Sequence, residues 1–194
     1  MNPVTEQARP LRADARRNRE RVLAAAREVL AVEGVDAQMT DIARRAGVGI
    51  GTLYRHFPDK TALIEALVAE RFTEFAALAR DALTAADAWT GFRDWLVACG
   101  AIQAGDRMIC DFLSEAIDGE RVGAIAEEVG LHAATEEVVA HAKREGALRP
   151  AVEASDIPTM MCGLGAIARS RAPHDQTWRR HLDFMLAGMR DPSS

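Results

Sequence analysis

Apolar residues recur along most of the chain at intervals of three and four positions, the spacing of one face of an α-helix. Residues 39–46 show this pattern clearly, since their apolar positions fall at i, i+3, i+4 and i+7: Met39, Ile42, Ala43 and Ala46. No alternation of apolar and polar residues runs long enough to predict a strand. The pattern therefore predicts an all-α protein with about nine helices.

Glycine and proline mark the ends of two short helices near the N-terminus. Gly47 follows a helix expected at about 38–46, and glycine readily adopts the left-handed conformation that ends a helix. Pro58 disfavours helical geometry in the residue before it, so the next helix is expected at about 50–57. Two short helices joined by a tight turn are a helix-turn-helix candidate, in which the second helix reads DNA.

The second of these helices has an unusual set of outward positions. Leu53 and Phe57 lie at i and i+4 and form its inward face. The positions left facing outwards are Ile50, Gly51, Thr52, Arg55 and His56. Isoleucine and glycine are poor choices for a helix surface exposed to water. We therefore expect this helix both to pack against the protein and to present a surface to a partner.

From residue 61 onward the pattern is helical throughout. Asp59 and Asp87 are expected to cap two of these helices, because an aspartate side chain accepts hydrogen bonds from exposed amides at a helix start. A single long helix is expected at about 120–145, and Gly146 is expected to end it. Two further helices follow, near the C-terminus.

Charge divides the chain into parts of opposite sign. Its net charge is −5, yet residues 1–60 hold 11 Lys and Arg against 8 Asp and Glu, which leaves the remainder at −8. An arginine cluster near the start could attract a polyanion or could form a solvated face: Arg9, Arg12, Arg16, Arg17, Arg19 and Arg21. The expected organisation is a basic flexible arm at 1–13, a helix-turn-helix domain at 14–60 and a helical domain at 61–190.

Several classes of protein are disfavoured by the sequence. No apolar stretch approaches the ~18 residues of a membrane span, and the charged N-terminus is unlike a signal peptide, so we expect a cytoplasmic protein without a membrane partner. Three cysteines without paired spacing argue against a disulfide framework or a zinc site. We also find no nucleophile elbow, phosphate loop or metalloprotease motif. We therefore expect no enzyme, no cofactor and no metal.

The stretch TDIARRAGVGIGTLYRHFPDKTALIEAL, residues 40–67, resembles the DNA-binding segment of TetR-type transcriptional regulators. The most specific positions are Gly47-Val48, Gly51-Thr52-Leu53-Tyr54, His56-Phe57 and Lys60. The resemblance extends over about residues 14–70, and GALRPAVEASDIPTMMCGL looks like a segment of many actinobacterial members. It implies a three-helix DNA-binding domain followed by a helical domain that dimerises and encloses an effector pocket. The implied function is a ligand-responsive regulator, by default a repressor. It would bind a palindromic operator in double-stranded DNA as a homodimer, and a small, largely apolar effector would release it.

The resemblance also implies which residues meet DNA. These are Ile50, Gly51, Thr52, Tyr54 and His56, with Lys60 touching phosphate at the start of the next helix. Thr40, Arg44 and Arg55 are further candidates for contact with DNA. Hydroxyl groups such as that of Tyr54 can bind phosphate oxygens, which position the protein without reading sequence. Arg55 or His56 could reach a base edge. Two positions depart from the family pattern, because Gln38 and Gly49 stand where the family often has a capping Ser or Thr, and neither is a strong side-chain cap.

Two sets of residues in the second domain are candidates for the effector and the dimer. Large or soft side chains that could line an effector pocket, or simply form the core, are Trp89, Phe92, Trp95, Cys99, Met108, Phe112 and Met161. The last two helices could form the dimer interface, or their apolar stripe could join the core of one chain. Its residues are Met160, Leu164, Ala168, Trp178, Leu182, Met185 and Met189.

A redox-sensing regulator is the alternative function. Cys99 and Cys110 could oxidise to a disulfide that moves the DNA-binding domains. Arg107 is the one neighbouring residue in sequence that would favour a reactive thiolate. On this hypothesis the signal is an oxidant rather than a bound ligand.

Overall fold

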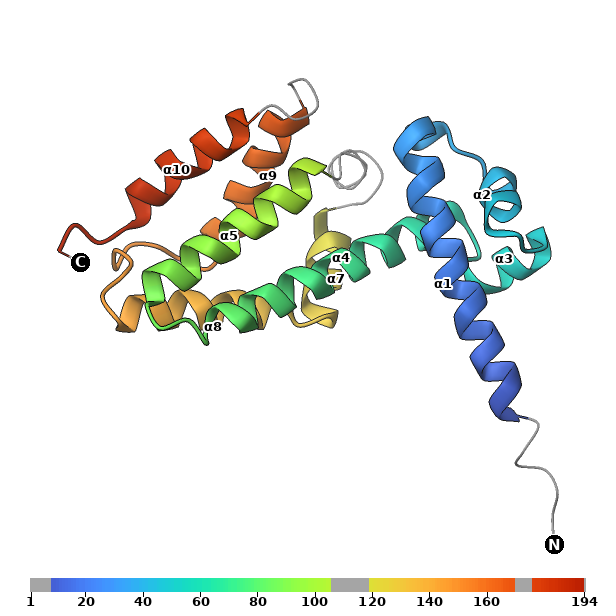
Figure 1. Ribbon diagram of the computed structural model, residues 1–194, viewed down its shortest axis with the longest axis horizontal. Helices are drawn as coiled ribbons and strands as arrows, with labels where there is room; N and C mark the ends of the chain where they lie inside the picture. The colour runs from blue at the N-terminus through green and yellow to red at the C-terminus, as the bar shows by residue number, and fades with distance from the viewer. Residues whose placement is uncertain (1–7, 106–118, 170–175, 194) are drawn as a thin grey trace, which may run out of the picture. The chain divides into compact units, whose positions relative to one another are not determined.

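The computed structural model describes residues 8–105, 119–169 and 176–193 (Figure 1). Over these ranges it contains nine α-helices and one short 3-10 helix, and no strand beyond an isolated bridge between Leu148 and Arg190. The predicted all-α fold is thus confirmed. The chain divides into two compact units, Met1–Leu67 and Val68–Ser194. This boundary lies inside a helix, seven residues later than the boundary expected after residue 60.

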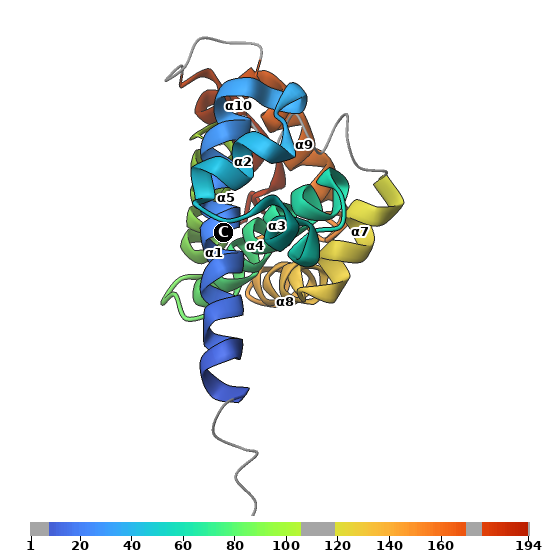
Figure 2. The ribbon, with the colours of Figure 1, turned by 90° about the vertical axis from the view of Figure 1, so that its right-hand side faces the viewer.

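The first unit contains three helices and the beginning of a fourth. They are α1 (Ala8–Glu33), the 3-10 helix η1 (Gly34–Asp36), α2 (Met39–Ala46), α3 (Ile50–His56) and the start of α4 (Lys60–Ala82). Figure 2 shows α2 and α3 beside α1, and residues of α1 contact both. Buried side chains from each helix form the core, among them Leu23, Leu30, Ile42, Leu53 and Leu63. The bounds of α2 and α3 agree with the sequence-based prediction to within one residue.

Part of the predicted N-terminal arm is helical. Helix α1 begins at Ala8, so residues 8–13 of the arm expected at 1–13 are helical. The segment ARPLRA favours helix because Ala, Leu and Arg have high helix propensity. Pro10 lies in the first turn, where its missing N–H removes no intrahelical hydrogen bond.

The connection between α2 and α3 follows the predicted geometry. Gly47 has φ 65° and ψ 37°, the left-handed conformation, and the amide of Val48 donates to the carbonyl of Ala43 at 3.1 Å. Within the described structure, neither Gln38 nor Gly49 makes a side-chain cap. Asp59, in contrast, accepts from the amide of Ala62 at 2.7 Å, which confirms it as the cap of α4.

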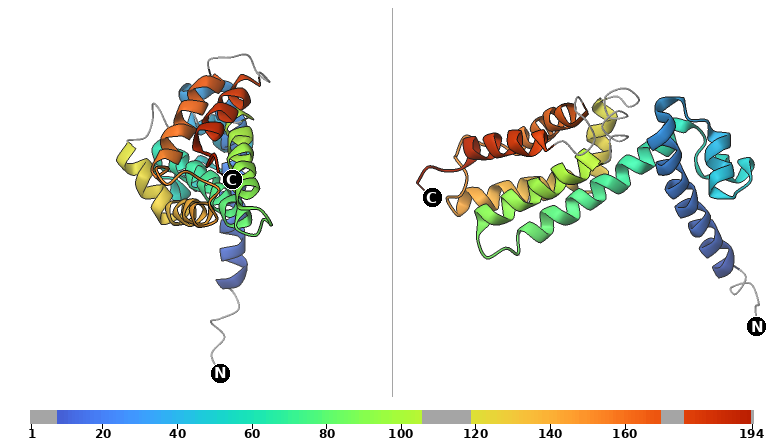
Figure 3. Two further views of the ribbon diagram at one scale, coloured as in Figure 1. Left: turned by 90° about the vertical axis from the view of Figure 1, so that its left-hand side faces the viewer. Right: turned by 45° about the horizontal axis from the view of Figure 1, so that its top comes forward.

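The second unit is a helical bundle around a single apolar core. It contains the rest of α4 together with α5 (Ala88–Gly105), α7 (Gly119–Glu128), α8 (Leu131–Arg144), α9 (Asp156–Arg169) and α10 (Thr177–Met189). Helices α9 and α10 lie side by side, and both pack on α5 (Figure 3). Asp87 caps α5 through the amide of Thr90 at 2.7 Å, as predicted. Hydrogen bonds from Thr90 lower the pKa of Asp87, consistent with a charged cap.

The prediction of a single long helix at about 120–145 is wrong. Helix α7 ends at Glu128 and α8 begins at Leu131, because Gly130 adopts φ 74° and its amide donates to the carbonyl of Glu127 at 3.0 Å. This is the left-handed helix end that glycine favours. The apolar spacing continues through the break, so periodicity alone conceals it. Gly146 does end α8 as predicted, with φ 70°.

The end of α10 is joined to the connection between α8 and α9. The amide of Arg149 donates to the carbonyl of Met189 at 2.9 Å, and the amide of Asp191 donates to the carbonyl of Ala147 at 3.1 Å. The guanidinium of Arg190 lies 5.1 Å from the ring centroid of Trp89. These contacts fix the last described turn of the chain to α5 and to the 147–149 segment.

Candidate nucleic-acid interface

The outward face of α3 combines apolar, hydroxyl and cationic side chains. Leu53 is fully buried, while Ile50 and Tyr54 are 40% and 47% exposed. Large apolar side chains that are this exposed are few in the described residues, and two of them lie on this one short helix. Ile50 and Tyr54 are four residues apart and so share one side of the helix, and apolar side chains that lie together among polar ones are typical of interaction surfaces. The remaining predicted outward residues are exposed (Gly51, Arg55) or half-buried (Thr52, His56).

Gly51 lies in a helix, and no neighbouring atom from elsewhere in the described structure requires glycine at this position. It lies in the first turns of α3 at an ordinary helical φ, and a Cβ built on it would meet no atom from elsewhere in the described structure within 4 Å. Glycine in a helix costs about 1 kcal/mol relative to alanine. The packing of the described residues therefore gives no explanation for this glycine, whereas a partner that approaches the backbone closely would explain it.

The cationic residues of α2 and α3 differ in whether their side chains form ion pairs. Thr40 and Arg44 are both exposed and lie four residues apart, so they share one side of the helix. Arg44 forms an ion pair with Asp41 on the same helix, and Arg45 forms one with Glu28 of α1. At the end of α3, Arg55 has no carboxylate partner within the described parts of the chain. Arg55 thus offers a whole positive charge to a partner.

Lys60, the first residue of α4, makes a hydrogen bond within the protein. Its Nζ donates to the carbonyl oxygen of Ala37 at 2.6 Å, and its side chain is half-buried. Ala37 lies in the connection between η1 and α2 and is 1% exposed. The lysine therefore links the first residue of α4 to the segment that leads into α2.

Two residues that sequence reasoning did not single out individually contact the turn before α3 and the C-terminal end of α3. The Nη2 of Arg21 donates to the carbonyl oxygen of Gly47 at 3.2 Å, and the guanidinium of Arg19 lies 5.3 Å from the ring centroid of Phe57. The sequence pointed to these two residues only as part of the arginine cluster near the start of the chain. Two other members of that cluster, Arg16 and Arg17, form exposed ion pairs within α1.

Five of the seven candidate effector residues are described by the structure, and they belong to the core of the second unit or pack against it. Phe92, Trp95 and Cys99 are 1%, 4% and 3% exposed, and Trp89 and Met161 pack against the same core. Met108 and Phe112 lie outside the described residues. The indole Nε1 of Trp95 is buried and has no hydrogen-bond partner in the structure as described. A buried donor without an acceptor calls for an explanation, and an absent ligand is one.

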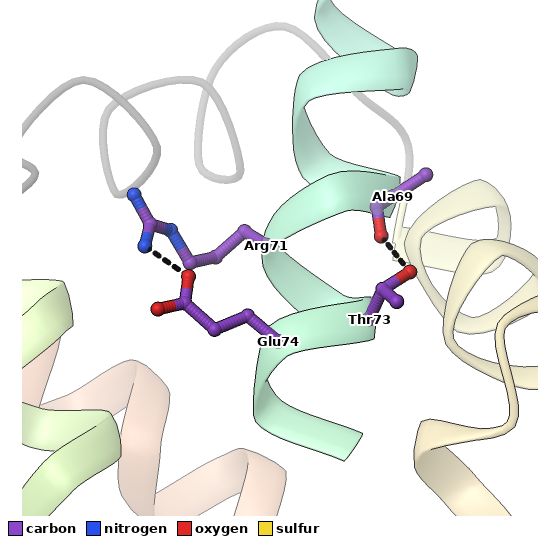
Figure 4. A network of polar contacts seen from close by, with 4 residues as sticks. All are labelled: Ala69, Arg71, Thr73 and Glu74. Carbon is purple, nitrogen blue, oxygen red and sulfur yellow. Dashed lines mark hydrogen bonds and ion pairs between the residues drawn. The ribbon is translucent and has the colours of Figure 1, made fainter. Parts of the chain in front are cut away.

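Helix α4 brings a pair of charges to the second unit (Figure 4). Arg71 donates to Glu74 at 2.5 Å, and its side chain is only 18% exposed. Thr73, on another side of the helix in this view, donates its hydroxyl to the carbonyl of Ala69 at 2.7 Å. After burial, the carboxylate of Glu74 is the second cause of the raised pKa of the Cys99 thiol. The mostly buried cation Arg71 thus has an acidic partner on its own helix.

The geometry does not support the redox mechanism. Burial is the main cause that raises the pKa of Cys99 to about 12, so its thiol stays protonated and unreactive at neutral pH. Cys110, the other half of the expected pair, lies outside the described residues. Cys162 is exposed on α9, apart from the buried Cys99.

The dimer-interface prediction needs correction at three positions. Leu164, Trp178 and Leu182 are 2%, 5% and 0% exposed, because they face the core of their own chain. Met160, Ala168, Met185 and Met189 are half-buried against that core. The outward faces of the two helices include other residues: Thr159, Cys162, Gly163 and Ala166 on α9, and Phe184, Ala187 and Gly188, beside the charged Arg179, Arg180 and Asp183, on α10. Phe184 is 62% exposed.

Metal-binding clusters and membrane spans are both missing from the described part of the chain. In the ranges that the structure describes, no group of three or more His, Cys, Asp or Glu residues is placed to hold a metal ion. None of the described helices combines the length and apolar character needed to cross a membrane.

Two family models match the chain. The model for bacterial regulatory proteins of the tetR family matches residues 22–67, and the model for the C-terminal domain of SbtR-like transcriptional regulators matches residues 84–191. The uncharacterized HTH-type transcriptional regulator TtgW of Pseudomonas putida is 43% identical over 65 residues. That match spans 33% of this chain and about half, 48%, of the length of TtgW.

Solved structures match over nearly the whole length. A TetR transcription regulatory protein from Mycobacterium vanbaalenii is 33% identical, with a TM-score of 0.65 over 93% of this chain and 99% of that one. The transcriptional regulator FadR from Bacillus subtilis, solved in complex with stearoyl-CoA, has a TM-score of 0.67 at 18% identity, over 88% and 98% of the two chains. At that identity the second likeness shows the fold alone.

Proposed function

The chain belongs to the TetR family of bacterial transcriptional regulators, which are not enzymes, and we propose that it is a ligand-responsive repressor. It binds a palindromic operator in the bacterial cytoplasm as a homodimer, and a small effector releases it. The DNA-binding proposal rests mainly on Gly51. This glycine is exposed and helical, and no packing in the described structure requires a glycine there. A groove of DNA against α3 supplies the missing reason, because a side chain there would hold the backbone away from the bases.

The other side chains of α3 complement DNA in distinct ways. The hydroxyls of Thr52 and Tyr54 bind phosphate oxygens and set the register of the helix. Arg55, which has no carboxylate partner within the described ranges, pairs with a guanine edge, a contact that contributes about 1–3 kcal/mol of discrimination. Ile50 packs on a thymine methyl group. Thr40, Arg44 and His56 lie around this set and add to it.

A homodimer supplies the specificity that one short helix lacks. Helix α3 has seven residues and can contact only a few base pairs, whereas two copies read two half-sites about one turn of DNA apart. The outward faces of α9 and α10 support this assembly. Their small residues, such as Gly163 and Gly188, let helices approach closely, and Phe184 supplies an apolar side chain that a second copy would bury.

The effector is proposed to be largely apolar with one hydrogen-bond acceptor. The aromatic side chains around Trp95 suit an apolar body. The buried Nε1 of Trp95 costs about 1–3 kcal/mol while it lacks an acceptor, and an oxygen of the ligand would remove that cost. Binding energy gained in this way can favour the conformation that does not fit the operator.

Selection from a randomised DNA pool tests the proposal. The purified protein is incubated with random duplexes at two salt concentrations, and the retained DNA is sequenced. We expect a palindromic motif that Thr52→Ala and Tyr54→Ala abolish, while Thr73→Ala, the same change on the exposed surface of α4, leaves it intact. Weak retention without a motif, unchanged by the first two substitutions, would overturn the DNA-reading function.

A further inference from the structure

Helix α3 is held by few interactions of its own. It has seven residues, it begins at Gly49 without a side-chain cap in the described structure, and Leu53 is its one fully buried side chain. Isolated helices shorter than about 12 residues are marginal in water. Its order and orientation must therefore come from the neighbouring helices, among which α1 contributes two cationic contacts.

The first contact is at the turn between α2 and α3, where Gly47 ends α2. Arg21 donates from Nη2 to the carbonyl of Gly47, across 26 residues of sequence, at 3.2 Å. A Cβ at residue 47 would lie 2.7 Å from the same nitrogen, so the guanidinium occupies the space that a side chain would take. The glycine thus serves both the left-handed turn and the approach of Arg21. This hydrogen bond attaches the turn before α3, which sets the direction of that helix, to α1.

The second contact is at the C-terminal end. The guanidinium of Arg19 lies 5.3 Å from the ring centroid of Phe57, within the range of a cation–π interaction. Phe57 is 2% exposed, and its amide donates to the carbonyl of Leu53 at 2.9 Å, which closes the last turn of α3. Residues two apart on a helix point in different directions. Arg19 and Arg21 can therefore reach different segments, the C-terminal end of α3 and the turn before α3.

We propose that Arg19 and Arg21 are positioning residues for operator reading, which hold the turn before α3 and the C-terminal end of α3 on α1 and do not themselves bind DNA phosphates. This inference rests on the proposed function, because it assigns a role in the same DNA-reading surface. A reading helix that is ordered before binding loses less conformational entropy when the complex forms. Loss of either contact should therefore weaken operator binding even though the protein remains folded.

The test measures the affinity of variants for the operator selected by the wild-type protein, over a range of salt concentrations. Arg19→Met and Arg21→Met keep the aliphatic stem and remove the guanidinium, and Arg16→Met is the matched control because its exposed ion pair with Glu20 lies within α1. We expect a loss of about 3- to 10-fold for each of the first two variants. The slope of log affinity against log salt should equal that of the control.

Two results would overturn the proposal. A slope that falls by about 0.9 for each of the two copies of the arginine in the homodimer, about 1.8 in all relative to the control, would show that the arginine neutralises a phosphate directly. An unchanged affinity would show that α3 does not depend on the contact. Arg21→Lys, which keeps a donor and the charge, should recover part of the affinity that Arg21→Met loses, and a failure to do so counts against the hydrogen bond.

Hydrogen exchange of the free protein separates local order from overall stability and from DNA binding. In Arg19→Met and Arg21→Met we expect faster exchange at the amides of Val48, Leu53 and Phe57, with no change in the second unit. Faster exchange throughout the chain would mean general destabilisation and would refute the positioning role. If the wild-type protein selects no motif at all, the proposed function fails, and this exchange experiment alone decides whether the two arginines order α3.

Discussion

The Nζ of Lys60 donates a 2.6 Å hydrogen bond to the carbonyl oxygen of Ala37, and this contact joins the start of α4 to the segment that leads into α2. The family resemblance implies that Lys60 touches phosphate. An ammonium group has three N–H donors, so a hydrogen bond to one carbonyl is compatible with a second bond to DNA. The residue thus has a role in the free protein that the resemblance did not indicate.

Lys60→Met should lower the stability of the free protein. The carbonyl of Ala37, a residue that is 1% exposed, would lose its donor, and a buried acceptor left without a partner costs about 1–3 kcal/mol. Urea denaturation followed by circular dichroism measures the change. Arg55→Met is the control, since it removes one charge from the exposed surface of the same unit and should change stability by less than about 0.5 kcal/mol. Equal stability of the two variants would contradict a structural role for Lys60.

Gly51→Ala should stabilise the protein and weaken its binding to DNA. The helical position has room for a Cβ, so alanine should raise the free energy of unfolding by about 0.5–1 kcal/mol. The same methyl group would separate α3 from the groove and reduce operator affinity. Gly123→Ala on α7 is the matched control, because that glycine is also helical, exposed and unobstructed within the described structure. It should give a similar gain in stability with unchanged affinity, and a parallel change of affinity in both variants would contradict the prediction.

Phe184→Glu should separate the dimer into folded monomers. The side chain is 62% exposed on α10, where the guanidinium of Arg180 lies 5.5 Å from its ring centroid, so a carboxylate there costs the single chain little but would lose its hydration in a dimer. Sedimentation velocity measures the oligomeric state, and the operator-binding assay should show a loss of affinity. Val32→Glu changes another exposed apolar residue, on α1, and should leave the oligomeric state unchanged. A dimer that persists in Phe184→Glu would place the interface elsewhere.

Cys99 should resist thiol reagents at neutral and mildly alkaline pH. Burial raises its pKa from 9.0 to about 12, so in a Cys110→Ser background the exposed Cys162 should be labelled and Cys99 should not. In the unfolded chain the thiol loses its proton near pH 9.0, while in the folded protein it keeps the proton. The contribution of Cys99 to the free energy of unfolding is therefore constant below pH 9.0 and falls as the pH rises towards 12. Cys99→Ala should remove this part of the pH dependence, and rapid labelling of Cys99 at pH 8 would refute its burial.

The elements that carry local signals were predicted well from the sequence. Gly47 and Pro58 bracket α3, and Asp59 and Asp87 cap the helices that follow them, because turns and caps depend on residues close together in the chain. The break at Gly130 was not predicted, although glycine is the residue that ends helices in this way. The apolar spacing continues through it, so the hydrophobic pattern and the local glycine signal disagree at this position.

Contacts between distant segments could not be predicted in the same way. A helical stripe such as that of α10 shows which residues avoid water, but it does not show whether they face their own chain or a second copy. Leu182 proved to face its own core, and Phe184, two residues later, is the one that is exposed. The contacts of Arg19 and Arg21 with Phe57 and Gly47 likewise depend on how α1 packs, which residue spacing within α1 does not reveal.

The pairing of residues 147–149 with residues 189–191 also determines how the chain would respond to a mechanical load. A pull on the C-terminus would meet the hydrogen bonds at Ala147 and Arg149 before it reached the body of α10. The helix would therefore not peel away turn by turn from its C-terminal end, because both of these backbone bonds must break first.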